Sequence, residues 1–531
     1  MIESDDNATY NTLSHWNTFK FKLIIEGIIV GILTGFIVVL YRYLLEKSLY
    51  VIDGLYIVLS QKYWLIPFWI VTLAIIGYIV GLLVKKEPMI SGSGIPQVEG
   101  VLLRKLHMNW LKVIIGKFVG GVLSIGSGLS LGREGPSVQL GAAVGLGVSR
   151  VFNRLKLEEK FLITSGASAG LAAAFNAPLA GAMFSLEETH KNFSPLVLLS
   201  ALSAALSADF VSSGFFGLEP VFDFKNLTTL TLNYYFYIAI LGVLVGILGV
   251  VFNKTIMKTQ DIYSMQKWLP AEFKPIVPLI LSVPLGLLLP QVLGGGHTLI
   301  MSLVKNNFHI KILVVLLVAK FLFTMVSYGS GAPGGIFLPL LTVGALIGTL
   351  YGTILVTIFH FNSIYISNFV ILAMAGYFTA VVRAPITGSI LITEMTGSFN
   401  HLLPLALISI IAYITADLLK SEPIYESLLD RFLMHNTNNK TIKDDKTKAI
   451  LEIAVYMGSL LDGKCIKEIE WPNNCLLVAV KRGEKEIIPK GNTLICPGDY
   501  LIVLTDNCGA SKVTESLLSM ANSYESKFKT Q

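Results

Sequence analysis

Residues 126–141 read Gly-Ser-Gly-Leu-Ser-Leu-Gly-Arg-Glu-Gly-Pro-Ser-Val-Gln-Leu-Gly, and this stretch decides how the chain is organised. Arg133 and Glu134 place two charges in an otherwise apolar run, and a charged group at membrane depth costs about 2.5 to 3.5 kcal/mol. The preceding glycines favour an irregular backbone, while Pro136 suits a first helical turn. The pattern predicts a helix that starts at Glu134 and presents unpaired N–H groups and a positive dipole end, which favour an anion.

The composition indicates a membrane protein. The 531 residues are 53% hydrophobic and 14% charged, whereas soluble proteins carry about 25% charged residues. We expect two antiparallel spans over residues 23–45 and 64–84, joined by a polar turn around residues 47–62. All apolar stretches that are long enough to enter a bilayer begin at Leu23, Trp64, Tyr234, Pro275, Ile312, Ile336 and Phe369.

Charge and cysteine usage exclude some function classes. Residues 1–20 are polar and acidic, which predicts a cytosolic tail and not a signal peptide. The net charge is +6, but no basic run is interleaved with aromatic residues, so we expect no nucleic-acid partner. The cysteines lack metal-ligand spacing, and we expect free thiols in a reducing cytosol and neither a cofactor nor a metal. The four cysteines are Cys465, Cys475, Cys496 and Cys508.

The chain repeats itself. The same residue types recur in the same order in two parts of the chain. The first block, Lys117, Gly126-Ser127-Gly128, Gly132 and Pro136, matches Lys320, Gly329-Ser330-Gly331, Gly335 and Pro339. The second block, Ala177-Pro178 and Glu187, matches Ala384-Pro385 and Glu394. We therefore expect two homologous halves, about residues 21–210 and 230–430, with interrupted helices at matching places and a site where those helices meet. If the halves are inverted, the helix starts at Glu134 and Phe337 face one another.

Two acidic positions each allow two interpretations. Glu134 is either held in a structural ion pair by Arg133 or is functional, and the glycines on both sides favour the functional interpretation. Glu187 and Glu188 end an apolar helix, where they are either solvated charges or a route by which protons enter the membrane.

Two matches to enzyme motifs carry no weight. Residues 166–170 fit GxSxG, but no strand precedes them and no histidine follows at a plausible position. Residues 329–334 fit GxGxxG without a flanking βαβ unit. We find no convergent nucleophile and base, so the sequence does not predict an enzyme.

The composition changes near the C-terminus. Residues 431–446 are expected to form a polar linker, and residues 447–531 a small soluble α+β domain. The expected strands are residues 450–455, 475–480, 486–489 and 500–504, and residues 512–520 are the expected final helix.

Four motifs together resemble one known family. The chain resembles the CLC chloride channel and transporter family in four motifs that occur in the same order. They are Gly92-Ser93-Gly94-Ile95-Pro96, Gly132-Arg133-Glu134-Gly135-Pro136, Gly335-Ile336-Phe337-Leu338-Pro339 and the later Tyr425. The resemblance implies a homodimer of all-helical subunits in the lipid bilayer, with two inverted repeats of broken or tilted helices and one anion pathway per subunit.

The resemblance also implies roles for individual residues. Ser93 and Tyr425 would give hydroxyls to a central anion, and Ile336 and Phe337 backbone N–H groups. Glu134 would be the gating glutamate, which competes with the anion. The other residues implied are Gly94, Ile95, Arg133 and Gly135 at the anion site, Glu188 with Glu187 beside it for protons, and Lys117 below the site. Ser93 itself resembles the chloride-preferring form of the motif.

The C-terminal segment, residues 450–520, resembles the TrkA-C domain, which in related proteins binds small ligands that include cyclic dinucleotides. Taken together, these resemblances imply a chloride/proton antiporter of the bacterial cytoplasmic membrane with cytosolic termini and a regulatory domain. A passive, gated chloride channel is the alternative.

Overall fold

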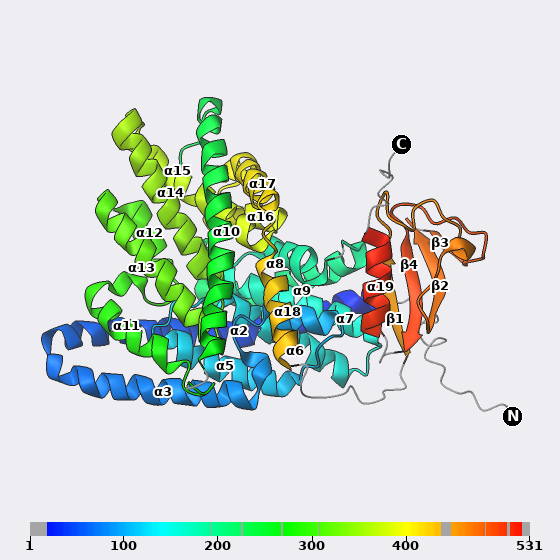
Figure 1. Cartoon of the computed structure of the whole chain (residues 1–531), viewed down its shortest axis with the longest axis horizontal. Coiled ribbons are helices and arrows are strands. Elements are labelled where there is room, and N and C mark those ends of the chain that lie inside the picture. The colour runs from blue at the N-terminus through cyan, green and yellow to red at the C-terminus, as the bar shows by residue number, and fades with distance from the viewer. Residues whose placement is uncertain are drawn as a thin grey trace.

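The computed structural model describes residues 19–191, 193–222, 224, 227–266, 269–306, 308–436, 448–483, 485–506 and 510–522. It consists of a large helical body and a small sheet domain at the right-hand end of Figure 1. Within the described residues, 8 helices are long and apolar enough to cross a membrane. The predicted class, a mostly helical multi-pass membrane protein with a small C-terminal α+β domain, is confirmed.

In chain order the helical body contains α2 (Phe19–Gln61), α3 (Ile66–Lys86), α4 (Ile95–Leu102), α5 (Trp110–Gly126), α6 (Glu134–Val151), α7 (Lys156–Phe175), α8 (Pro178–Phe184), the π-helical turn η4 (Ser185–His190), α9 (Pro195–Phe216), α10 (Tyr235–Met265), α11 (Ile276–Leu288), α12 (His297–Lys305), α13 (Ile310–Gly329), α14 (Phe337–Phe359), α15 (Ile366–Val382), α16 (Pro385–Thr396), α17 (Leu402–Leu418) and α18 (Ile424–Asn436).

The first helix corrects one prediction. α2 is 43 residues long and continues through residues 47–61, where we expected a polar turn. Its apolar side chains recur at helical spacing beyond Leu45, and Ile52 and Tyr56 are buried in the core, so packing keeps this segment helical. At about 1.5 Å per residue, α2 exceeds the roughly 30 Å hydrocarbon layer. The chain reverses at Lys62 instead.

The set of spans also differs from expectation. Pro195–Phe216 and Phe399–Leu418 are two further candidate spans that we did not anticipate. The apolar stretch at Pro275 forms α11, which has only 13 residues. Such a helix is too short to cross the hydrocarbon layer.

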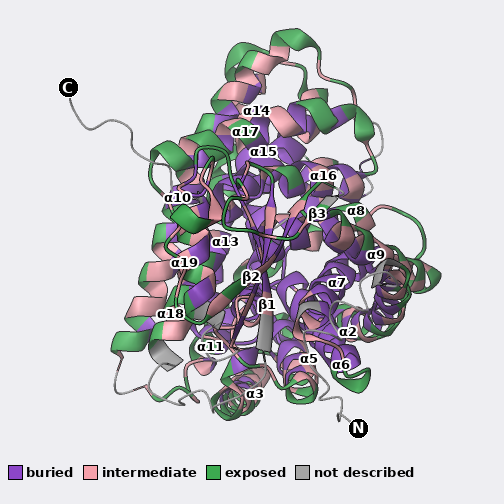
Figure 2. Cartoon of the chain, turned by 90° about the vertical axis from the view of Figure 1, so that its right-hand side faces the viewer, coloured by how far each residue is buried: buried purple, intermediate pink, exposed green. Residues whose placement is uncertain are grey.

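Two helices form the centre of the body. Every residue of α6 from Glu134 to Ser149 is buried, as is every residue of α15 from Asn368 to Val382, and Figure 2 shows this buried interior around α6, α7 and α15. α6 and α7 approach closely where Gly141 faces Gly166. A Cβ atom on Gly141 would collide with the Gly166 carbonyl oxygen, so glycine is what permits this contact. Small residues at such contacts are typical of packed membrane helices.

The two halves of the sequence make reciprocal contacts. The Gly132 N–H donates to the Gly335 carbonyl at 2.6 Å, and the Gly335 N–H donates back to the Gly132 carbonyl at 2.7 Å, in an antiparallel bridge. α6 and α14 begin directly after the two bridged segments. Reciprocity of this kind is what a two-fold relation between two similar units produces.

The C-terminal domain is a four-stranded antiparallel sheet covered by one helix. Its elements are β1 (Lys448–Ala454), β2 (Cys475–Arg482), β3 (Lys485–Ile487), β4 (Tyr500–Asp506) and α19 (Ala510–Asn522). The strand order is β1-β4-β2-β3, with Lys448 opposite Asp506. All four predicted strands and the final helix are present, within a few residues of the expected limits.

The segment expected to link the two domains begins within α18. α18 continues to Asn436, so the first residues assigned to the linker are helical, and the remainder of that linker lies outside the described residues. Three of the cysteines, Cys465, Cys475 and Cys496, are free thiols, as expected. Cys508 and the predicted N-terminal tail up to residue 18 also lie outside the described residues.

Candidate functional site

Glu134 is the first residue of α6 and is fully buried. Neither of its carboxylate oxygens makes a hydrogen bond of standard geometry within the described residues, and the backbone N–H groups of Glu134 itself and of Leu338 are near them. The carboxylate folds back over Gly132, where a Cβ atom would collide with Oε2, and the Leu338 amide nitrogen lies 3.1 Å from that same Cβ position. The acid therefore lies between the N-terminal ends of α6 and α14, both of which favour negative charge.

Ser93 lies opposite this helix start. Its loop turns through Gly92 and Gly94, whose φ angles of 57° and 92° are in the left-handed region, and Gly94 caps α4. The Ser93 hydroxyl is buried without a partner in the described structure. A Cβ atom on Gly135 would collide with that hydroxyl, so glycine at position 135 lets Ser93 approach α6. Ile95, the first residue of α4, is fully buried.

Tyr425 brings a second unpaired hydroxyl to this place. It lies on α18, is fully buried, and its oxygen has no hydrogen-bond partner in the described part of the chain. The Ser93 side chain lies beside its hydroxyl, and Glu134 and Glu188 act on that hydroxyl electrostatically. Residues about 330 positions apart in the sequence thus meet at one point, each with an unsatisfied polar atom. Buried polar atoms are normally hydrogen-bonded, so this gathering indicates a site for a polar occupant.

Ile336 and Phe337 form the fourth side, at the start of α14. Both are buried. The Phe337 ring packs against three other rings, with centroid distances of 4.7 Å to Phe378, 5.3 Å to Phe175 and 6.1 Å to Phe184. This aromatic cluster fixes the position of the first turn of α14. The Gly132–Gly335 bridge fixes the segment that leads into that turn.

Two buried lysines hold the backbone around the site. Lys117 donates through Nζ to the carbonyl oxygens of Ile90, at 3.0 Å, and Gly92, at 2.7 Å, immediately before Ser93. Lys320, its counterpart in the sequence repeat, donates in the same way to Val292 at 2.9 Å and to Gly294 at 2.7 Å. Lys117 and Lys320, which correspond in the sequence repeat, thus also make corresponding hydrogen bonds.

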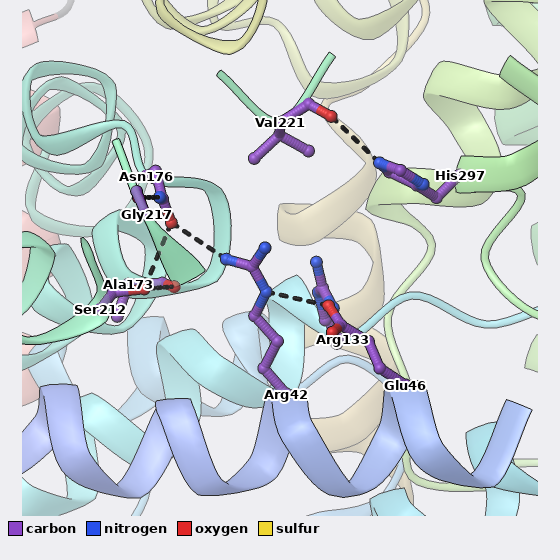
Figure 3. Close-up of polar contacts among 9 residues, drawn as sticks. All are labelled: Arg42, Glu46, Arg133, Ala173, Asn176, Ser212, Gly217, Val221 and His297. Carbon is purple, nitrogen blue, oxygen red and sulfur yellow. Dashed lines mark hydrogen bonds and ion pairs between the residues drawn. The ribbon is translucent and has the colours of Figure 1, made fainter. Parts of the chain in front are cut away.

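Arg133 does not pair with Glu134. Its Nη1 lies 2.8 Å from Glu46 Oε1 on α2, and Arg42 Nε lies 3.0 Å from the same oxygen. Figure 3 shows this arrangement, in which Arg42 also donates to the Asn176 side chain at 3.0 Å. Arg42, Glu46 and Arg133 line a cavity of about 430 Å³, which His297 also lines. Sequence analysis missed Arg42 and Glu46, and the structural ion-pair interpretation of Glu134 is wrong.

Glu187 and Glu188 lie in the π-helical turn η4 and have different surroundings. The Glu187 carboxylate accepts hydrogen bonds from the N–H groups of Ile386 at 3.2 Å and Thr387 at 2.7 Å, which caps α16. Glu188 is buried, and its Oε1 has no partner within the described residues. A solvated acidic pair, one of our two interpretations, therefore does not fit the structure. π-helical turns are frequent at functional sites.

Further charged groups surround Glu188 that the sequence did not indicate. Lys191 Nζ lies 2.6 Å from Glu99 Oε1 and also contacts Glu426. All three side chains act electrostatically on Glu188. Two features of the sequence could have pointed to these acids. Glu426 directly follows Tyr425, and Glu99 lies on α4, the helix that begins beside Ser93.

Paired helices that are broken at matching places, with unsatisfied polar groups where they meet, define a membrane transport protein built from internal repeats. Residues 76–417 match the family model of the voltage-gated chloride channel, and residues 450–518 match that of the TrkA-C domain. The chain belongs to this chloride channel family, and it carries a TrkA-C domain.

Similar proteins include the H(+)/Cl(-) exchange transporter ClcA of Vibrio campbellii, which is 40% identical over 72% of this chain and 82% of its own length. The ClcA of Vibrio parahaemolyticus is 36% identical over 81% of this chain and 91% of its own length. A solved structure of a slow cyanobacterial Cl−/H+ antiporter is similar with a TM-score of 0.72 and 31% identity, covering 78% of this chain and 99% of that one. These relatives are transporters and not enzymes.

Proposed function

We propose that the chain exchanges chloride for protons across a bacterial cytoplasmic membrane. The observation that carries the proposal is the Glu134 carboxylate, which is buried without a hydrogen bond of standard geometry in the described structure, between two helix N-terminal ends. A buried carboxylate without a partner is energetically costly, and such groups are normally retained because they have a function, such as carrying protons. The similarity to ClcA transporters supports the same activity.

The anion lies between α4, α6, α14 and α18. The Ser93 and Tyr425 hydroxyls, both without partners in the described part of the chain, donate to it. The backbone N–H groups of Ile336 and Phe337 complete its coordination, because the positive end of α14 lies there. Gly94, Ile95 and Gly135 shape the walls. Arg133 and Arg42, which share Glu46 between them, line the outer cavity in front of this position together with Asp53.

Glu134 couples the anion to the proton. The charged carboxylate and an anion repel each other at short range, so they exclude one another from the same place. The protonated side chain lacks this repulsion and leaves the position to the anion. Passage of chloride past Glu134 is therefore linked to uptake and release of protons by this side chain.

Glu188 is the inner proton station. It is buried next to the cluster of Lys191, Glu99 and Glu426, and Lys191 also lines a cavity against β1. Glu187, which the sequence offered as an alternative station, is engaged in capping α16 through both oxygens. We therefore assign proton transfer to Glu188, and positioning of the turn to Glu187.

The organisation proposed for the whole protein follows the sequence analysis. Residues 1–20 form a cytosolic tail, residues 21–430 the membrane domain, residues 431–446 the connection, and residues 447–531 the regulatory domain, with both termini in the cytosol. Two chains form a homodimer, which holds two regulatory domains close together, and a small anionic ligand such as a cyclic dinucleotide binds there. Calorimetry with candidate nucleotides tests this last part.

The decisive experiment measures chloride and proton fluxes at the same time in liposomes that contain the purified chain. Proton movement against its gradient, driven only by a chloride gradient, is the expected result. Chloride flux without any proton movement would instead identify a passive, gated channel.

A further inference from the structure

A small cavity at the edge of the helical body is lined by four cationic side chains and one carboxylate, among apolar side chains. It has a volume of about 70 Å³ and lies between the segment that connects α4 to α5, the end of α6 and the start of α7. Four of its side chains are basic and one is acidic. The charged residues are Arg104, Arg150, Lys156, Lys160 and Glu159.

The single carboxylate does not balance these cations. Glu159 lies 2.9 Å from Arg150 and 3.3 Å from Lys156, so it serves both at once. The Arg150 side chain is 54% exposed in spite of this contact, which leaves its other nitrogens accessible to a ligand. An arginine beside lysines is the arrangement that recognises phosphate oxygens, because the guanidinium group donates two parallel hydrogen bonds.

The size of the cavity restricts the ligand. A water molecule occupies about 30 Å³ in the liquid, so the cavity has room for a compact oxyanion. Sites for nucleotide-sized molecules are several times larger, roughly 300 to 1,000 Å³. The cavity therefore fits a single phosphate group whose remainder lies outside.

An apolar surface starts at the mouth of the cavity. His107 and Met108 line it, and α5 begins two residues later at Trp110. Leu111, Ile115 and Val119 are exposed on α5, and their spacing of four residues places them on one face of that helix. Tryptophan at a membrane boundary followed by an apolar helix face is typical of a surface that contacts lipid.

We propose that this cavity binds the phosphate group of an anionic phospholipid, with its acyl chains along the exposed face of α5. Basic pockets at the cytosolic ends of membrane helices are suited to such headgroups. The leaflet concerned is the one on the side of the sheet domain, because Arg104 Nη2 also donates to the Ile450 carbonyl of β1, at 3.5 Å. The proposal rests on the placement of the chain in the membrane and not on the transport reaction.

The same cations contact the sheet domain. Lys160 acts electrostatically on Glu452 of β1, and a second cavity of about 230 Å³, between α7 and β1, shares both Arg104 and Lys160. A phosphate that binds these two side chains therefore competes with β1 for them. Membrane composition would in this way influence how firmly the sheet domain is docked.

The test uses the full chain in detergent, offered equal amounts of phosphatidylglycerol and phosphatidylcholine, with the retained lipids counted by native mass spectrometry. The wild type should retain phosphatidylglycerol preferentially. The variant R150Q/K156Q should bind it about 30-fold more weakly, since each basic group near an anionic headgroup contributes about 1 kcal/mol. The matched control is K47Q/K62Q, which removes two exposed cations, one in the second half of α2 and one directly after it, and should leave retention unchanged.

A second variant, which should strengthen lipid binding, distinguishes a specific effect on the cavity from misfolding. E159Q removes the competing carboxylate and should tighten phosphatidylglycerol binding about fivefold. Inorganic phosphate is added in a separate arm, and displacement of the lipid by millimolar phosphate would identify a phosphate site that soluble anions also reach. Equal retention of the two lipids by the wild type, or unchanged retention in R150Q/K156Q, would overturn the proposal.

Discussion

Glu187 and Glu394 cap each other's helices. Glu187, in the turn after α8, accepts hydrogen bonds from the first N–H groups of α16, and Glu394, on α16, accepts them from Leu179 at 3.1 Å and Ala180 at 2.7 Å at the start of α8. The two acids occupy equivalent places in the sequence repeat. The exchange of caps joins the two halves of the chain directly beside Glu188.

This symmetry predicts similar effects on stability, although Glu187 also accepts a hydrogen bond from the Thr387 hydroxyl at 2.7 Å. Glu187→Ala and Glu394→Ala should each lower the stability of the protein by about 1 to 2 kcal/mol, because each leaves two helix N–H groups without a cap. Thermal unfolding of the purified variants, followed by tryptophan fluorescence, measures the effect. A clearly larger loss for one of the two would show that the capping interactions are not equivalent.

The neighbouring acid should behave differently. Glu188→Gln is expected to stop proton flux in liposomes and to leave chloride flux and thermal stability near the wild-type level, since Glu188 caps no helix and Oε1 has no partner among the described residues. Glu187→Gln is the matched control and should retain coupled proton flux. If Glu188→Gln still transported protons, Glu188 would not be the inner station.

At the centre, Glu134→Gln should abolish proton movement while chloride still passes. The amide has nearly the shape of the protonated carboxyl group, but it cannot release a proton. Simultaneous recordings with a chloride electrode and a pH electrode measure both fluxes. Uphill proton transport by this variant would contradict the assignment of Glu134 as the coupling group.

Ser93→Pro should shift the preference of the transporter from chloride toward nitrate. The substitution removes both the hydroxyl and the N–H donor at position 93, and these favour the smaller, more strongly hydrated ion. Ser93→Ala removes only the hydroxyl, so comparing the two variants separates the contributions of the side chain and the backbone. Anion competition assays measure the selectivity, and an unchanged chloride preference in Ser93→Pro would exclude Ser93 as a determinant.

The two buried lysines allow a matched comparison. Lys117→Met and Lys320→Met each leave two buried carbonyl groups without their donor, and both should cost about 2 to 4 kcal/mol of stability. Only Lys117 holds the loop that carries Ser93, so only Lys117→Met should also weaken chloride binding, measured by isothermal titration calorimetry. Equal chloride affinities in the two variants would show that Lys117 has no specific influence on the anion site.

Local sequence signals predicted the helix starts at Glu134 and Phe337, and the structure places α6 and α14 there. Glycines immediately before the helix and a proline in its first turn determine such a start, and all of them are neighbours in the chain. The strands of the C-terminal domain were predictable for the same reason, because turn residues separate short apolar runs.

Contacts between distant segments could not be predicted in this way. Arg133 has an adjacent acid in the sequence but pairs with Glu46, which is 87 positions away. Glu187 caps a helix 200 positions further on. The continuation of α2 past Leu45 depends on burial of Ile52 and Tyr56 against other helices, which a local pattern does not reveal.

The bridge between Gly132 and Gly335 has a consequence for the scale of motion. Its two hydrogen bonds, at 2.6 Å and 2.7 Å, tie together the segments from which α6 and α14 begin. The helices of the two halves cannot rock apart at this point without breaking backbone hydrogen bonds inside the membrane, where water cannot replace them. The Glu134 side chain, in contrast, can change position by rotation about its own bonds. In the exchange proposed above, opening and closing at the centre is therefore a matter of one side chain turning within a fixed frame.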